Sequence, residues 1–98
     1  MNKVDQSAGN KLLNAGHLVG PPPGKVTHAP YRKEPYIRVT YRDGSKRDGK
    51  ALAWTPAWVL LHTEKESVYE EWVPAPAVAR IPRQDSEWQD PYDILTPR

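Results

Sequence analysis

The chain contains no cysteine and no phenylalanine, and only one methionine occurs among its 98 residues. The absence of cysteine excludes disulfide frameworks and thiolate metal sites, and it leaves the redox compartment open. No run of about 18 apolar residues occurs, so we expect no membrane-spanning helix. Residues 1–20 lack an apolar run followed by a cleavage site, which argues against a secretory signal and favours a cytoplasmic protein.

Apolar residues are also scarce, at 38% of the chain, and 11 residues are proline. A chain of this length builds one small domain, and this apolar share predicts that the core is confined to one segment. Nearly all the large apolar residues outside the ends of the chain lie in residues 35–82. We therefore expect that segment to fold.

Charge divides the chain in the same way. Residues 1–34 hold five basic and two acidic residues, and residues 83–98 hold two basic and four acidic ones. We expect a flexible basic leader over 1–34 and an acidic tail over 83–98. Trp88, Tyr92 and Leu95 are spaced so that a helix would align them. The tail is thus either disordered or a linear motif that folds on a partner or docks back on the domain.

Short alternating runs separated by turn residues predict β-strands in the middle segment. Tyr36–Tyr41 has Ile37, Val39 and Tyr41 on one face, and two Asp-Gly pairs in 42–49 predict a loop. Further strands are expected over 50–54, 58–62, 68–73 and 78–81, and the third of the five, 58–62, is apolar enough on both faces to be the most buried. Two closely spaced prolines in 74–77 predict a 3₁₀-like turn.

The run WVPAPAVARI, from Trp72 to Ile81, resembles the end of SH3-like small barrels, a group that includes SH3 and Tudor-like domains. In these barrels a strand leads through a single 3₁₀ turn into a short closing strand. The resemblance covers residues 35–82 and implies a mainly β fold, a five-stranded SH3-like barrel with flexible tails. The chain lacks the aromatic-rich opening strand and acidic first loop of peptide-binding SH3 domains, which argues against proline-rich ligands.

The sequence contains no catalytic pattern. The histidines are His17, His28 and His62, and their spacing matches no zinc site. Glu70 and Glu71 are adjacent, so a strand directs them to opposite faces and they cannot act as a carboxylate pair. No phosphate-binding glycine loop is present. We therefore expect a protein that is not an enzyme and that uses no cofactor or metal.

The leading hypothesis is a small binding or adapter protein that acts through protein–protein contacts. Four tryptophans and five tyrosines are many for this length, and such residues commonly anchor interfaces. Self-association through a strand edge belongs to the same hypothesis. The small size and lack of cysteine also suit a phage or mobile-element accessory factor. The candidate contact residues are Tyr41, Trp54, Trp58, Trp72, Trp88 and Tyr92.

The alternative is DNA or RNA binding through the basic hairpin over 42–50. Lysine and arginine side chains there could contact phosphates while nearby aromatic rings stack on bases. Against this, Asp43 and Asp48 partly balance the positive charge. The candidate residues for this alternative are Arg38, Arg42, Lys46, Arg47 and Lys50.

Overall fold

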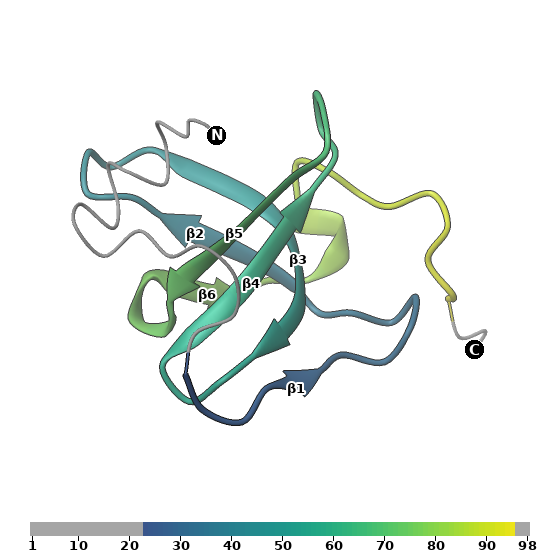
Figure 1. Ribbon diagram of the computed structural model, residues 1–98. Helices are drawn as coiled ribbons and strands as arrows, with labels where there is room; N and C mark the ends of the chain where they lie inside the picture. Colours follow the sequence, from purple (N-terminus) through teal and green to yellow (C-terminus); the bar gives the residue numbers. More distant parts are fainter. Residues whose placement is uncertain (1–22, 96–98) are drawn as a thin grey trace.

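The computed structural model describes residues 23–95, which form a mainly β domain built on one antiparallel sheet (Figure 1). Residues 1–22 of the expected leader and 96–98 of the expected tail lie outside the described residues. The strands are β1 (Thr27–His28), β2 (Tyr36–Thr40), β3 (Lys46–Trp54), β4 (Trp58–Thr63), β5 (Tyr69–Pro74) and β6 (Val78–Arg80). Two 3₁₀ turns, η2 (Ala75–Ala77) and η3 (Arg83–Asp85), follow β5 and β6.

Strand β2 forms where the period-two pattern predicts it. Ile37, Val39 and Tyr41 all lie in the buried core cluster, which confirms that they share one face. Tyr36 belongs to the opposite face and is nevertheless buried. Something other than the core must therefore cover this second face of the sheet.

Strand β3 is longer than predicted, because residues 46–49, expected in a loop, pair with β2. The turn that joins β2 to β3 is correspondingly short, and Gly44 in it has a φ of 87°. That left-handed geometry suits glycine and explains the first Asp-Gly pair. The second pair has a different role, because Gly49 lies inside the strand, close to the backbone of His62.

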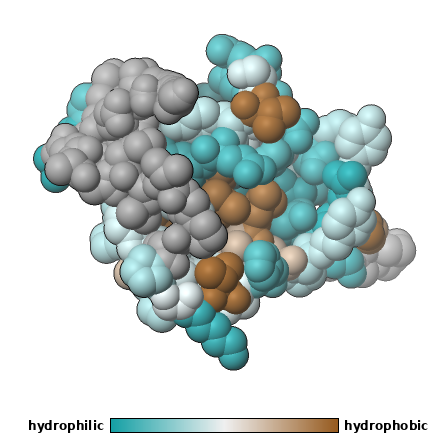
Figure 2. Space-filling view, viewed as in Figure 1, coloured by the Kyte–Doolittle hydropathy of each residue, from teal (hydrophilic) through white to brown (hydrophobic). Residues whose placement is uncertain are grey.

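Strand β4 forms as predicted but is not the most buried strand. Leu61 is fully buried, whereas Val59 and Leu60 are half-buried, and β3 has more buried positions. Only Leu61 and Thr63 of β4 are buried, and the remaining residues of the strand are half-buried. On the side of the molecule viewed in Figure 2, hydrophobic residues gather near the centre among hydrophilic ones.

The 3₁₀ turn η2 and the short strand β6 form where the sequence predicts them. The strand order is β5-β4-β3-β2-β6, with β1 attached to β3. No pairing joins β5 to β6 within residues 23–95, so this sheet of six strands is not closed. A five-stranded barrel is therefore not confirmed. None of the helical elements in these residues is long and apolar enough to cross a membrane.

The segment after β6 does not extend away from the domain. Trp88 is 9% exposed, and its ring lies 6.4 Å from Tyr36 and 5.9 Å from His62. The Glu87 amide donates to Asp48 Oδ2 at 2.9 Å. The described part of the expected tail thus packs on the second face of the sheet and covers Tyr36, as the docking interpretation of the tail anticipated.

Gly49 offers a test of the β3–β4 packing. A Cβ atom on Gly49 would lie 2.3 Å from the carbonyl oxygen of His62 and 2.9 Å from Leu61 Cδ1. Because backbone cannot yield as a flexible side chain does, we expect Gly49→Ala to lower the free energy of unfolding by about 1–3 kcal/mol. Urea denaturation measures this loss, and an unchanged midpoint would contradict the close approach of the two strands.

Candidate interaction site

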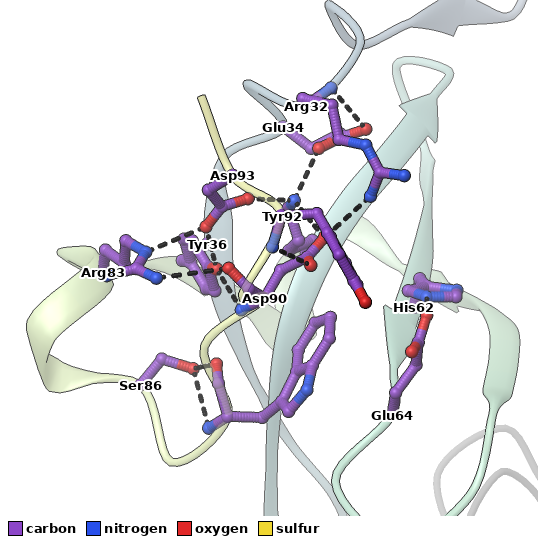
Figure 3. Close-up of polar contacts among 12 residues, drawn as sticks. Arg32, Glu34, Tyr36, His62, Glu64, Arg83, Ser86, Asp90, Tyr92 and Asp93 are labelled. Atoms are coloured by element: carbon purple, nitrogen blue, oxygen red, sulfur yellow. Dashed lines mark hydrogen bonds and ion pairs between the residues drawn. The ribbon is translucent and has the colours of Figure 1, made fainter. Parts of the chain in front are cut away.

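The most densely connected group of side chains surrounds the ammonium of Lys50, whose side chain is only 2% exposed. Its Nζ lies 2.6 Å from Glu34 Oε1 and 3.1 Å from Asp90 Oδ2, and it also donates to Asp93. We call Glu34, Lys50, Asp90 and Asp93 the Lys50 cluster, and Figure 3 labels its three carboxylates. Its residues come from β3, from the chain before β2 and from the C-terminal segment, so it ties three parts of the sequence together.

Two arginines complete the charge balance around the cluster, and one tyrosine adds hydrogen bonds to it. Arg83 Nε donates to Asp93 Oδ2 at 2.8 Å, and Arg32 NH1 lies 3.5 Å from Asp90 Oδ2. The Tyr36 hydroxyl donates to Asp93 and accepts from the Asp90 amide. Three cations therefore face three carboxylates, which is the condition under which burying charge is tolerated.

The pKa values of these groups follow from their contacts. Burial would lower the pKa of Lys50, but its hydrogen bonds to Asp93, Glu34 and Asp90 outweigh burial and raise it. Burial alone would raise the pKa of Asp93. The hydrogen bonds that Lys50, Tyr36 and Arg83 donate to it have the larger combined effect, so the pKa of Asp93 is lowered. The pKa values of Asp90 and Glu34 are lowered against burial in the same way. All four groups are thus held in their charged forms.

Above this cluster, an arginine lies between two exposed aromatic rings. The Arg32 guanidinium is 4.9 Å from the centre of the Tyr31 ring and 5.3 Å from that of Tyr92. The Ile94 amide donates to the Arg32 carbonyl at 3.0 Å, which joins the C-terminal segment to the turn at 30–33. Cations over aromatic faces are attracted by the ring quadrupole, so Arg32 is held in place.

The backbone at Arg32 is in an unusual conformation. Its φ is 60°, the one positive φ among non-glycine residues in 23–95. The Lys33 amide donates to the Pro30 carbonyl, so Arg32 occupies the third position of a tight turn, where glycine or asparagine is usual for such a φ. Strained backbone of this kind concentrates at functional sites, which motivates a functional hypothesis for Arg32.

Exposed apolar side chains gather at the same place. Of the large hydrophobic residues that are exposed in 23–95, only Val68 lies elsewhere, on the β4–β5 turn. A groove of about 270 Å³ lies between Arg32 and the end of the C-terminal segment, and Tyr36 and Asp93 contribute to its lining. We call the following residues the Arg32 surface: Tyr31, Arg32, Tyr92, Ile94 and Leu95.

A second hollow, of about 260 Å³, lies between the start of β3 and the β4–β5 turn. Arg47 enters this region with its guanidinium 4.1 Å from the Tyr69 ring, and Lys65 pairs with Glu87 at 2.8 Å. Beneath this hollow the Tyr69 hydroxyl donates to Glu71 at 2.7 Å. Burial is the main cause that raises the pKa of Tyr69, and the hydrogen bond to the Glu71 carboxylate raises it further. The charges of the hollow are balanced, so it offers no clear electrostatic preference for a ligand.

The aromatic candidates from the sequence are scattered rather than gathered. Tyr41, Trp72 and Trp88 are buried at 3%, 8% and 9% exposure, while Trp54 and Trp58 are half-buried against the core. Tyr92, at 70% exposure, is the one candidate on the Arg32 surface. Trp88 and Tyr92 do not share a helical face, because the chain turns at Pro91 instead of forming a helix.

The basic candidates are divided as well. Lys50 is buried among carboxylates, so its side chain is not available to phosphates. Arg38 forms two hydrogen bonds to Asp48, at 2.7 and 2.9 Å, and its side chain stays 34% exposed. Arg42, Lys46 and Arg47 remain near the β2–β3 turn. The adjacent glutamates do point to opposite faces, Glu70 toward His62 and Glu71 toward Tyr69, as predicted.

Sequence reasoning missed the Lys50 cluster and most of the Arg32 surface. The available signal was the excess of acidic residues over 83–98, which anticipates docking on basic residues without identifying them. Among residues 23–95, no group of three or more potential metal ligands is arranged to hold an ion. Comparison of the chain with protein-family models, curated proteins and solved structures found nothing similar to it.

Lys50 provides the first test of the site. Lys50→Met removes the central cation and leaves buried carboxylates uncompensated, so we expect the free energy of unfolding to fall by about 3–5 kcal/mol. Lys46→Met, on the same strand but exposed, should change it by less than about 0.5 kcal/mol. Chemical denaturation of both variants measures the difference. Equal effects would show that the cluster contributes no particular stability.

The pH dependence of stability provides a second test. The carboxyl pKa values of Glu34, Asp90 and Asp93 are lowered on folding, so their contribution is complete above the ordinary values of 4.5 and 3.8. It is lost as the pH falls through the lowered values. The raised pKa of Lys50 acts oppositely: its contribution is complete below 10.5 and is lost as the pH rises through the raised value.

We therefore expect the thermal midpoint to be nearly constant from about pH 5 to 8 and to fall steeply below about pH 4. In Asp93→Asn the acid slope should be shallower, because one titrating carboxyl has been removed. Calorimetry across this range measures both slopes. An identical acid slope in the variant would indicate that Asp93 does not titrate with folding.

Proposed function

We propose that this chain is a small non-enzymatic binding protein, an adapter whose Arg32 surface contacts a protein partner. We also propose that its domain has the architecture of an SH3-like small barrel. The strand order β5-β4-β3-β2-β6 and the 3₁₀ turn between β5 and β6 support this architecture. Folds of this kind carry many functions, so the functional proposal rests on the surface alone.

The observation that carries the proposal is the gathering of exposed apolar residues around one immobilised arginine. Tyr31 and Tyr92 are 75% and 70% exposed, and Ile94 and Leu95 are also more than half exposed. Soluble proteins rarely expose contiguous apolar groups without an interaction that covers them. Tyrosine and arginine are enriched among the residues that dominate binding energy at protein interfaces.

Protein is favoured over nucleic acid as the partner for an electrostatic reason. Among the basic candidates, Lys50 is buried and Arg38 is already paired with Asp48, so less positive charge is available to phosphates than the sequence suggests. Nucleic-acid affinity depends mainly on the number of phosphates neutralised. The Arg32 surface is instead rich in apolar area, which suits a protein partner.

Selection of binders from a random peptide library displayed on phage tests this proposal. We expect peptides selected on the wild type to lose at least about tenfold in affinity for Tyr92→Ala, because truncating an interface anchor commonly costs more than 1 kcal/mol. Arg32→Gly should lose affinity similarly while keeping the turn, since glycine adopts the φ of 60° without strain.

Val68→Ala is the matched control, because Val68 is an equally exposed apolar residue on the β4–β5 turn. Its affinity for the selected peptides should equal that of the wild type. Peptides whose binding is insensitive to Tyr92→Ala and Arg32→Gly would place the interaction elsewhere. Their discovery would overturn the assignment of function to the Arg32 surface.

A further inference from the structure

We propose that the partner presents an acidic peptide segment in which carboxylates flank one or two apolar side chains, and that the Arg32 surface binds it. This inference rests on the proposed function and specifies the chemistry of its partner. Two independent observations support it: the sign of the charge that the surface exposes, and the way in which the chain binds its own acidic segment.

The charges around the Arg32 surface are unequally exposed. The carboxylate side chains of the Lys50 cluster are 6% exposed for Asp93, 12% for Asp90 and 14% for Glu34. In contrast, the Arg32 side chain is 34% exposed, and Lys33 beside it is an exposed residue. The formal charges nearly cancel, but solvent and any partner meet mainly the positive ones. Such a surface favours partners of opposite charge.

The chain's own C-terminal segment shows which peptide chemistry this part of the domain accepts. The Trp88 ring lies against the rings of Tyr36 and His62. Asp90 binds Lys50, and Asp93 binds Arg83, as Figure 3 shows for the second pair. An acidic peptide with an aromatic anchor is thus already docked on the second face of the sheet. The Arg32 surface, to which the end of that segment contributes Tyr92, Ile94 and Leu95, repeats the same combination of cation and apolar side chains.

The dimensions of the groove support a side chain as its occupant. Its volume of about 270 Å³ is smaller than pockets that enclose drug-sized ligands, which are about 300–1,000 Å³. Ile94 and Leu95 provide apolar lining, and Arg32 and Lys33 lie at the same groove. One apolar side chain of a peptide can enter between them while neighbouring carboxylates reach the two cations. The other hollow does not offer this combination, because its lining holds no aliphatic side chain and its three cationic residues are matched by three acidic ones.

The test uses three fluorescein-labelled peptides and the full chain. The first is Asp-Asp-Leu-Tyr-Leu-Asp-Asp, and the other two replace every Asp with Asn or with Lys. In fluorescence anisotropy at low salt, we expect the Asp peptide to bind about tenfold more tightly than the Asn peptide. The Lys peptide should show no binding. Raising the salt concentration should weaken binding of the Asp peptide only.

Variants locate the interaction on the domain. Lys33→Gln should weaken binding of the Asp peptide about threefold, as expected for one exposed charge. Lys46→Gln is the matched control, because Lys46 is equally an exposed lysine but lies at the other hollow. Its affinity should be unchanged. In two-dimensional NMR spectra, the Asp peptide should shift the amide signals of Tyr31, Arg32 and Tyr92.

Equal affinities for the Asp and Asn peptides would overturn the inference, and so would shifts confined to Lys46 and Arg47. These outcomes are distinguishable from failure of the proposed function. If library selection yields neutral or basic peptides that depend on Tyr92, the Arg32 surface binds protein but not acidic segments. If the selected peptides are insensitive to Tyr92→Ala, both proposals fall together.

Discussion

The structure depends on a buried ammonium. Lys50 lies on the second face of the sheet, where three carboxylates from two other segments surround it. A lysine without them would face a large desolvation cost, and the carboxylates without the lysine would face the same cost. The sheet, the segment before β2 and the segment after β6 are therefore fixed together, although the hydrophobic core on the other face does not include Lys50.

This arrangement explains how so small a domain can hold the exposed Arg32 surface in a defined shape. Glu34 and Asp90 both bind Lys50. Arg32 lies two residues before Glu34, and Tyr92 lies two residues after Asp90, so both are close to the cluster. The unfavourable φ of Arg32 is maintained by the surrounding contacts, which is the usual condition for strained backbone to persist. A surface that is held in place before binding loses less entropy when a partner arrives.

The sequence predicted the parts of the fold that depend on local patterns. Alternation located β2, and the prolines after Val73 located η2 and the short strand β6. The prediction of a loop over residues 46–49 was wrong, because the sequence does not distinguish a glycine required for close strand packing from a glycine in a turn. The Lys50 cluster could not be predicted, since it joins residues about forty positions apart. No local pattern distinguishes a buried lysine from the exposed one at Lys46.

The most direct test of this account is whether the segment at residues 86–94 is held on the sheet in solution. Heteronuclear NOE measurements should give values for these amides that match those of the strands, together with NOEs between the rings of Trp88 and Tyr36. That result would show that the Lys50 cluster positions the Arg32 surface. Low values typical of a mobile tail, without ring contacts, would contradict it.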